Sequence, residues 1–388
     1  MTPSARFAAA IDVLQHITNR LSAEKALTHW SRANRYAGSK DRAAVRDHVF
    51  DVLRQRRSLA HLGGGDTPRA LVLGLLRQQK IDPETVFGAG GYSPSALSSQ
   101  ELDTSLDPPN TAAQLDLPDW LWPVWHADLG DQARQAAVQL QSRAPISLRV
   151  NLRRGTRAAA IDALAADGIV TIPSDEVKTG LQVIENERRL RLSSSFCNGL
   201  VELQDIASQR AVAGLGLCSG SRVLDYCAGG GGKALALADM HDVKVFAHDI
   251  ASARTVDILP RAARAKIPMT VLTTEMLASH GPFDMVFCDA PCSGSGTWRR
   301  TPEAKWAFTS EKMNDFNKLQ GSVLADASGF VGPGGLLVYA TCSVLSAENE
   351  DVVDRFLAQN AGWRCVSRNL RVPDSSGDGF YYCVLQRE

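Results

Sequence analysis

The 388-residue chain lacks an excess of either charge, because 42 Lys and Arg balance 42 Asp and Glu. Its net charge therefore gives no reason to expect nucleic acid to be attracted over the whole surface. No stretch reaches the roughly 18 uncharged apolar residues of a membrane span, and the amphipathic start is interrupted by charge, so we expect neither a membrane segment nor an export signal. With 44% apolar and 22% charged residues, the chain has the composition of a globular protein that is long enough for two or three domains.

Cysteine is missing before Cys197, and all 8 cysteines of the chain lie between there and Cys383. They show no paired C-x-x-C spacing and no neighbouring histidine pattern, so we predict no metal site. In the absence of an export signal, we expect free thiols and a cytoplasmic location. Cys288, Cys365 and Cys383 lie in apolar segments and are interpreted as small core residues.

Residues 1–140 are expected to form a helical domain, because apolar residues recur at three- and four-residue spacing. Thr67-Pro68 predicts a helix N-cap with proline at the first helical position. Residues 88–111 are rich in Gly, Ser and Pro, which predicts a loop. The tryptophans of "DWLWPVW", Trp120, Trp122 and Trp125, favour docking of one domain on another over base stacking.

Basic residues outnumber acidic ones from Met1 to Asp66. Such a local excess can steer RNA even when the whole chain is neutral, although a solvated helix face explains the charges equally well. If RNA binds here, replacing Arg54 and Arg56 by Ala should weaken that binding. The basic residues of this stretch include Arg32, Arg35, Lys40, Arg42, Arg46, Arg54, Arg56 and Arg57.

Residues 141–205 predict a small α+β module, with the strand-like "PISLRVNL" followed by a helical stretch and further alternating segments. From residue 206 to 388, strand-like runs alternate with helical stretches. This alternation predicts an α/β fold with a mostly parallel, doubly wound, Rossmann-like sheet. The closing run "DGFYYCVLQRE" is expected to be an antiparallel strand at the end of that sheet.

A glycine-rich turn follows the first of these strands, in "VLDYCAGGGGKALALA". The backbone of such a turn can approach a ligand closely and present N–H groups to it. Lys233 is followed by Ala234 rather than Ser or Thr, so the turn is not a phosphate-binding P-loop. Asp249 closes the second strand, where a carboxylate can accept both hydroxyls of a ribose. These features are typical of a nicotinamide dinucleotide or S-adenosylmethionine site.

Two cysteines follow later strand-like runs, in Asp289-Ala-Pro-Cys292 and Thr341-Cys342-Ser343. Hydride transfer needs neither thiol, so the pair favours S-adenosylmethionine as the cofactor. One thiol could attack an electron-poor ring carbon while a methyl group is delivered to the neighbouring carbon. The acids after Ser346, Glu348 and Glu350, are interpreted as the charged first turn of a helix capped by Ser346.

Taken in order, these motifs resemble the Sun/Fmu family of RNA (cytosine-5) methyltransferases, and most closely its bacterial 16S rRNA methyltransferase B group. The ordered set is "VLDYCAGGGGK", "AHDI", "FDMVFCDAPCSGSGTWRRTPEAKW", "LLVYATCSVLSAENEDVV" and "DGFYYCVLQR". The resemblance covers the catalytic domain, and it extends more weakly to an RNA-recognition-like module and a NusB-like helical domain upstream. The family's Ala-Pro-Gly-Gly-Lys is replaced here by Ala228, four glycines and Lys233, so this turn has lost its proline.

The resemblance implies roles for individual residues. Cys342 would be the nucleophile, Asp289 would contact cytosine nitrogen 3, and Cys292 would assist release. Glu275 takes the place of an aspartate that binds the adenine edge, and Arg254 fits either the cofactor site or a salt bridge. The implied cofactor-binding residues are Cys227, Ala228, Gly229, Gly230, Gly231, Gly232, Lys233, Asp249, Arg254, Glu275 and Asp289.

Basic and aromatic residues follow the first of these cysteines. They offer phosphate contacts and a stacking plane for single-stranded RNA, although Trp306 fits a packing role equally well. The expected RNA-binding residues are Arg299, Arg300 and Lys305, beside Trp298 and Trp306.

The leading hypothesis is therefore a monomeric, S-adenosylmethionine-dependent enzyme that forms 5-methylcytosine in RNA. Its predicted substrate is 16S rRNA. A tRNA substrate is the first alternative. A non-catalytic RNA-binding or assembly protein on the same frame is the second, and a methyltransferase of small molecules or proteins is the third. Neither of the last two explains why both cysteines and Asp289 are present together.

Overall fold

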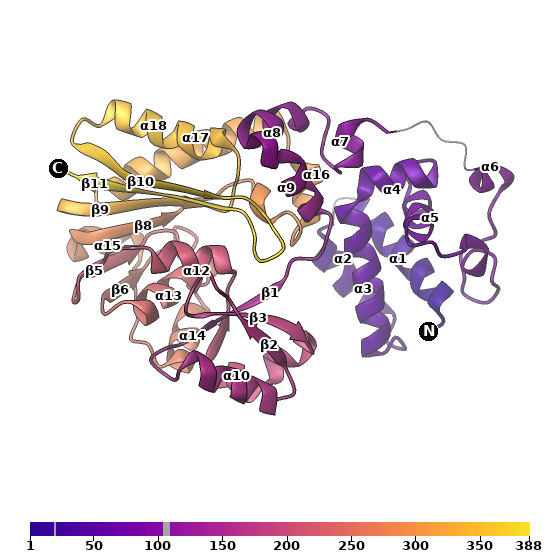
Figure 1. Ribbon diagram of the computed structural model, residues 1–388, viewed down its shortest axis with the longest axis horizontal. Helices are drawn as coiled ribbons and strands as arrows, with labels where there is room; N and C mark the ends of the chain where they lie inside the picture. Colours follow the sequence, from indigo (N-terminus) through magenta and orange to yellow (C-terminus); the bar gives the residue numbers. More distant parts are fainter. Residues whose placement is uncertain (19–20, 104–108) are drawn as a thin grey trace. The chain divides into compact units, whose positions relative to one another are not determined.

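The computed structural model describes residues 1–18, 21–103 and 109–388 (Figure 1). Two compact units make up the fold. The first contains residues 1–143 and 298–308, and the second contains residues 144–297 and 309–388. The chain therefore leaves the second unit after Thr297 and re-enters it at Thr309. None of the described helices is long and apolar enough to cross a membrane.

The first unit is helical. Its main core is formed where the apolar faces of the first five helices meet, with Val13, Trp30, Val49, Leu59 and Leu73 among the buried residues. These helices are α1 (Pro3–Thr18), α2 (Ala23–Ala33), α3 (Ser39–Arg54), α4 (Arg56–Gly63) and α5 (Pro68–Gln78). Later elements of the unit are α6 (Ser99–Leu102), α7 (Thr111–Gln114), α8 (Leu121–Leu129), α9 (Ala133–Leu140) and α16 (Pro302–Ala307).

The predicted cap at the start of α5 is confirmed. The Thr67 side chain accepts a hydrogen bond from the Ala70 N–H, and Pro68 occupies the first turn. The loop predicted for residues 88–111 contains the short helix α6, and its residues 104–108 lie outside the described part of the chain.

Residues 298–308 pack inside the helical unit, although they directly follow the segment that carries Cys292. The Arg54 Nε donates to the Arg299 carbonyl at 2.8 Å, and the Lys305 ammonium donates to the Arg54 carbonyl at 3.0 Å. The Trp298 ring stacks on Trp125 at a centroid distance of 6.1 Å. Residues 298–308 are thus part of the helical unit, although the sequence predicts them to be part of the catalytic domain.

The second unit is built on a seven-stranded sheet with the strand order β10-β11-β9-β8-β5-β6-β7. Strands β9, β8, β5, β6 and β7 are parallel, which confirms the predicted doubly wound α/β fold. The strands are β5 (Arg222–Asp225), β6 (Lys244–Ala247), β7 (Thr270–Val271), β8 (Phe283–Asp289), β9 (Val331–Thr341), β10 (Trp363–Arg371) and β11 (Phe380–Arg387).

Helices cover both faces of this sheet, as Figure 1 shows. Alternate strand residues point to opposite sides, so Phe287 and Val338 join one core while Val286 and Leu337 join the other. The first core includes α12 (Ile206–Ala213), α13 (Gly232–Met240) and α14 (Ile258–Ala265). The second includes α15 (Thr274–His280), α17 (Ser310–Ser328) and α18 (Glu350–Gln359).

The predicted final strand, β11, is antiparallel to β9, but it does not lie at the end of the sheet. Strand β10 pairs with its other side and takes the edge position. The sequence of β10 alternates weakly and is mostly exposed or half-buried, so it carries little of the pattern that identifies a strand.

A small α+β module precedes the sheet within the second unit. It has a four-stranded antiparallel sheet in the order β2-β3-β1-β4. One face forms a separate core with α10 (Arg157–Ala166), in which Leu148, Leu164 and Leu181 are fully buried. The strands are β1 (Ile146–Val150), β2 (Val170–Pro173), β3 (Gly180–Glu185) and β4 (Val201–Leu203).

The other face of this module docks on the seven-stranded domain through polar contacts. The buried Arg149 of β1 forms an ion pair with Asp239 of α13. The Asn151 amide donates to the Ala265 carbonyl at 2.8 Å. Buried, paired groups of this kind fix the orientation of two elements more specifically than apolar contact alone.

Candidate active site

The glycine-rich turn lies where β5 ends and α13 begins. Gly229 and Gly231 have φ values of +50° and +81°, a conformation that side chains with a Cβ rarely adopt. A Cβ on Gly231 would also lie only 3.0 Å from Ile258. The turn therefore depends on glycine for both its backbone shape and its close approach to α14, which runs beside it.

Asp249 follows β6 and supports this turn. Its carboxylate accepts hydrogen bonds from the N–H groups of Gly229 and Ala251, each at 2.9 Å. Arg254 forms an ion pair with the same carboxylate at 3.2 Å. The structure thus places Arg254 beside the predicted ribose-binding group, where the salt bridge and the cofactor-site role are compatible with each other.

Glu275 lies in the first turn of α15, after β7. Hydrogen bonds from the Thr273 side chain and from its own backbone lower the pKa of this exposed carboxyl. Its expected contact with the adenine edge stays a prediction.

These residues fit S-adenosylmethionine. The glycine turn is a cradle that a side chain would fill, Asp249 offers carboxylate oxygens near the end of β6, and Asp289 ends the adjacent β8. Ligands of such sheets bind beyond the carboxyl ends of the strands, and all three features lie at that edge. The turn, Asp249 and Asp289 are accordingly the groups that would hold the nucleoside and the methionine part.

Lys233 and Asp289 form an ion pair next to the turn, with the Lys233 Nζ 2.5 Å from a carboxylate oxygen. Burial disfavours the charge on Lys233, but the charge and hydrogen bond of Asp289 outweigh it and raise the lysine pKa. The ammonium also lies 5.2 Å from the centre of the Phe380 ring. Lys233 is therefore a half-buried partner of Asp289 rather than a solvated helix residue.

Asp225, the last residue of β5, is 1% exposed. Burial and, next, the charge of Asp289 raise its pKa to about 7, although Lys233 acts in the opposite direction. No local pattern distinguishes Asp225, because a strand-terminal aspartate before a turn is common. Its environment makes it a carboxyl that can hold a proton near neutral pH.

The two predicted cysteines come together beside this ion pair. Cys292 follows β8 and Cys342 follows β9, and their sulfur atoms lie 3.4 Å apart. A hydrogen bond from Cys292 lowers the pKa of Cys342, with smaller lowering effects of Lys233 and Thr297, against burial and the charge of Asp289. The same hydrogen bond, together with burial, raises the pKa of Cys292. Cys342 is thus the thiol that ionises first.

Glu348 is a buried residue that fixes both cysteine segments, and our interpretation of it as part of a charged first helical turn capped by Ser346 is wrong. It is 0% exposed, it lies in a short 3₁₀ turn (Ser346–Glu348), and Asn349 is the residue that precedes α18. Its carboxylate accepts the Ser293 N–H at 2.8 Å and the Ser343 hydroxyl at 2.6 Å. Ser293 and Ser343 directly follow the two cysteines, so one carboxylate sets the spacing of both segments.

Further hydrogen bonds connect the same two segments. The Ser295 and Ser343 hydroxyls are 2.8 Å apart, and the Gly296 N–H donates to the Cys342 carbonyl at 2.9 Å. Gln320 of α17 donates to both Glu348 and the Pro291 carbonyl. This network holds the thiols before any substrate arrives, as preorganised sites require.

The structure separates the three predicted RNA-binding residues. Arg299 and Lys305 are each 1% exposed, within the packed segment 298–308 of the helical unit, which contradicts their expected exposure to RNA. Burial and the charge of Arg54 lower the pKa of Lys305 to about 8, against the effect of Asp116. Arg300 is exposed, and its contact with RNA stays a prediction. Trp306 donates its indole N–H to the Leu53 carbonyl at 2.6 Å, which is the packing role.

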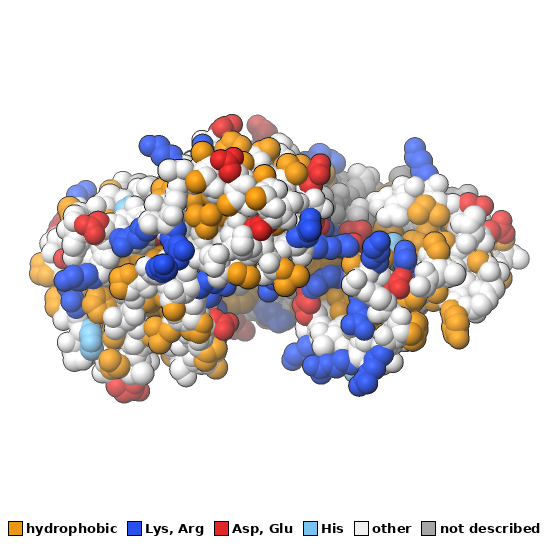
Figure 2. Space-filling model, turned by 90° about the horizontal axis from the view of Figure 1, so that it is seen from below, with side chains coloured by type: hydrophobic (Ala, Val, Ile, Leu, Met, Phe, Trp, Pro, Cys, Tyr) orange, Lys and Arg blue, Asp and Glu red, His pale blue; other side chains and the backbone are white. Residues whose placement is uncertain are grey.

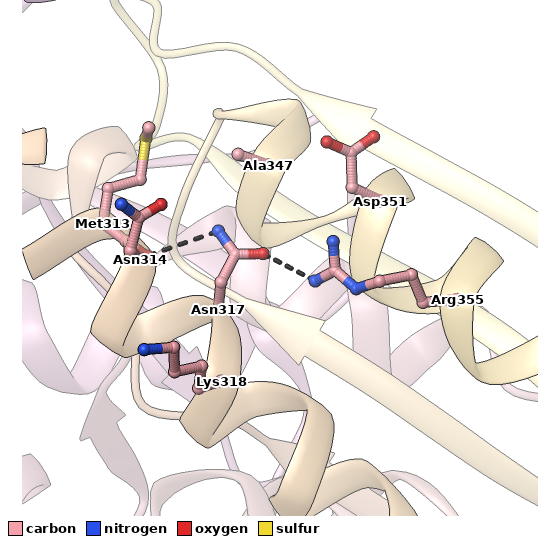
Figure 3. Close-up of a pocket in the computed structure, with 7 residues that line it drawn as sticks. All are labelled: Met313, Asn314, Asn317, Lys318, Ala347, Asp351 and Arg355. Carbon is pink, nitrogen blue, oxygen red and sulfur yellow. Dashed lines mark hydrogen bonds between the residues drawn. The ribbon is translucent and has the colours of Figure 1, made fainter. Parts of the chain in front are cut away.

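A polar groove of about 500 Å³ lies between α17 and α18, as shown in Figure 3. The Arg355 guanidinium donates to the Asn317 amide oxygen at 2.6 Å across this groove. None of the predicted catalytic or cofactor residues lines it. Its lining consists of Met313, Asn314, Asn317, Lys318, Ala347, Asp351 and Arg355.

Comparison with known proteins found matches to one family of proteins. The profile of the family described as 16S rRNA methyltransferase RsmB/F matches residues 213–385, and that of the RsmF/B-like ferredoxin-like domain matches residues 117–188. Ribosomal RNA small subunit methyltransferase B of Xylella fastidiosa (strain Temecula1) is 32% identical over 390 residues, covering 90% of each chain. The protein of the same name from Vibrio cholerae is 31% identical, covering 70% of this chain and 65% of its own.

Solved structures show the same fold. The crystal structure of PH0851 covers 100% of this chain and 99% of its own, with a TM-score of 0.76 and 22% identity. NSun6 from Pyrococcus horikoshii, crystallised with the S-adenosylmethionine analogue SFG, covers 70% of this chain and 98% of its own, with a TM-score of 0.62 and 15% identity.

The fold and site define a Rossmann-like, S-adenosylmethionine-dependent methyltransferase preceded by a ferredoxin-like module. Within that class, the chain belongs to the RsmB/F methyltransferase family.

Proposed function

We propose that this protein methylates carbon 5 of a cytosine in 16S rRNA through a covalent adduct with Cys342. The observation that carries the proposal is the 3.4 Å approach of the Cys292 and Cys342 sulfur atoms, beside the Lys233–Asp289 ion pair. A methyltransferase that acts on a nucleophilic oxygen or nitrogen has no use for two thiols, whereas carbon 5 of cytosine needs activation. The relatives' name, ribosomal RNA small subunit methyltransferase B, supports the choice of substrate.

The residues divide the reaction between them. The Cys342 thiolate forms a bond to carbon 6. The 5,6 double bond becomes a 4,5 double bond, and the electron pair of the 3,4 double bond moves onto nitrogen 3. Lys233 passes a proton through Asp289 to nitrogen 3, which neutralises the charge that develops there, and the proton returns when the adduct breaks down. S-adenosylmethionine supplies the methyl group when bound. Loss of the carbon 5 proton to a base then restores the 5,6 double bond and expels Cys342. Cys292, whose sulfur lies 3.4 Å from that of Cys342, assists this release.

The target base must leave any stack before it can reach Cys342. Exposed basic residues of the helical unit offer phosphate contacts that would position the surrounding RNA. Arg32, Arg35, Lys40 and Arg42 are exposed around the connection from α2 to α3, near the exposed Tyr36 ring. Figure 2 shows Lys and Arg side chains gathered on this unit. Arg54 is buried at 6% exposure and is therefore removed from the predicted RNA contacts.

The test is product identification. Purified protein, S-adenosylmethionine with a labelled methyl group and unmodified 16S rRNA are incubated, and the RNA is digested to nucleosides and separated by mass spectrometry. We expect labelled 5-methylcytidine with the natural protein and none with Cys342→Ala. Label in any other nucleoside, or transfer to tRNA in preference to 16S rRNA, would overturn the proposal.

A further inference from the structure

The four consecutive glycines of the cofactor turn create a problem of conformational entropy. Glycine loses more backbone freedom on ordering than any other residue. A run from Gly229 to Gly232 therefore orders only if something outside the run holds it. Asp249 fixes its beginning through the Gly229 N–H, and α13 fixes its end, where the helix starts at Gly232.

The middle of the run is held by Arg261 of α14. The Arg261 guanidinium donates a hydrogen bond to the Gly230 carbonyl. The two groups are packed closely, since a Cβ on Gly230 would lie 3.2 Å from the Arg261 Nη1. Arg261 is only half-buried, and the mechanism described above does not use it.

Arg261 is itself oriented by the ferredoxin-like module. Glu202 of β4 lies 3.5 Å from the Arg261 Nε and 2.6 Å from the Arg264 Nη2. The neighbouring Gln204 reaches the same turn directly, by donating to the Gly232 carbonyl at 3.3 Å. Gln204 is in turn fixed by Arg149, whose Nε donates to it at 2.7 Å. Gln204 thus supports the turn directly, and Glu202 supports it through Arg261.

We propose that Arg261 is a positioning residue that holds the four-glycine turn in its cofactor-binding shape, and that Glu202 makes this support depend on the ferredoxin-like module. This inference rests on the assignment of the turn as the S-adenosylmethionine site. Arg261 acts on cofactor affinity rather than on the chemical step, because it contacts the backbone of the turn and not the thiols.

The test measures binding of S-adenosylhomocysteine to the full chain by calorimetry. Arg261→Ala should weaken binding about tenfold, as expected for a lost hydrogen bond from a charged donor. At saturating S-adenosylmethionine, the kcat of Arg261→Ala should stay within about twofold of the natural value, so that only the KM for S-adenosylmethionine rises. Arg264→Ala is the matched control, because Arg264 lies on the same helix and contacts Glu202 but not the turn. The affinity of this variant for S-adenosylhomocysteine should change less than twofold.

A rescue separates loop ordering from direct contact with the cofactor. Gly230 does not have a left-handed φ, so alanine is permitted there once the Arg261 side chain is removed. Alanine restricts the backbone of the free turn. Adding Gly230→Ala to Arg261→Ala should therefore recover at least twofold in affinity. Glu202→Gln should weaken binding less than Arg261→Ala does, because it leaves the arginine in place.

A second variant, Asp249→Ala, separates failure of the site assignment from failure of the role of Arg261. Asp249→Ala tests the assignment of the site: if it leaves affinity unchanged, the turn is not the cofactor site and both ideas are overturned. If Asp249→Ala abolishes binding while Arg261→Ala does not weaken it, the proposed site stands and the role of Arg261 is rejected. Equal losses in Arg261→Ala and Arg264→Ala, or a lack of rescue by Gly230→Ala, would also reject it. Thermal melts of each variant identify any that fail to fold, and Arg261→Lys then replaces Arg261→Ala, with a smaller loss expected.

Discussion

The sulfur atoms of Cys292 and Cys342 lie 3.4 Å apart on segments that follow two neighbouring parallel strands, and the hydrogen bond between them favours the thiolate at Cys342. Because the pKa of Cys342 is lowered, the thiolate should form at a lower pH than in an ordinary cysteine. Alkylation of Cys342 by iodoacetamide, followed by peptide mass spectrometry across a pH series, measures this. Cys292→Ala removes the donor and should shift the Cys342 profile to higher pH. An unchanged or lowered midpoint would contradict this account of the pair.

Glu348 should be essential for holding the two thiols in place. Glu348→Ala leaves the Ser293 N–H and two hydroxyls without their buried acceptor, and we expect it to cost about 3 kcal/mol of unfolding free energy and to reduce kcat strongly. Urea unfolding and methyl transfer assays check both effects. Asp351→Asn, at an exposed position of α18, is the control and should change stability by less than about 0.5 kcal/mol. Comparable effects of the two substitutions would mean that Glu348 is not the support that we describe.

Asp225 should make stability depend on pH. Its folded-state pKa of about 7 is higher than in the unfolded chain, so the folded state holds a proton that the unfolded state releases. Stability is therefore lost as the pH rises from about 4 to about 7, by roughly 2 to 4 kcal/mol. Asp225→Asn removes this loss, so it should raise the melting temperature relative to the natural protein more at pH 8 than at pH 5. An equal shift at both pH values would contradict the raised pKa.

The exposed arginines and lysine between α2 and α3 should contact RNA. Combining Arg32→Ala, Arg35→Ala and Lys40→Ala should weaken RNA binding and reduce the slope of log Kd against log salt by about 2, since each phosphate contact releases counterions. Affinity for S-adenosylhomocysteine should not change. Arg134→Ala, at an exposed position of α9, serves as the control. An unaltered salt slope in the triple variant would leave the charges as an ordinary solvated helix face.

Sequence motifs were sufficient to predict the sheet, the glycine turn and the two thiols, because each lies in a local pattern. An apolar run identifies a strand, and polar residues at its carboxyl end identify the site edge. The same rule predicts Cys292 and Cys342 at that edge, and the structure shows that they meet there because β8 and β9 are neighbours.

The residues that sequence reasoning missed depend on packing between distant segments. Glu348 has the local pattern of a helix-start acid, and only the fold shows that it accepts hydrogen bonds from residues that follow both cysteines. Arg299 and Lys305 have the charge of RNA contacts, yet residues 298–308 are packed among the N-terminal helices. No local periodicity records such long-range burial, and charge alone does not distinguish a buried arginine from an exposed one.

The most direct test of the central claim is to trap the adduct. Cys292→Ala protein is incubated with S-adenosylmethionine and 16S rRNA, and a denaturing gel is examined for a covalent protein–RNA species. The two-thiol account predicts an adduct that accumulates in Cys292→Ala and disappears when Cys342→Ala is added. An adduct that persists without Cys342, or methyl transfer by the Cys342→Ala protein, would contradict it.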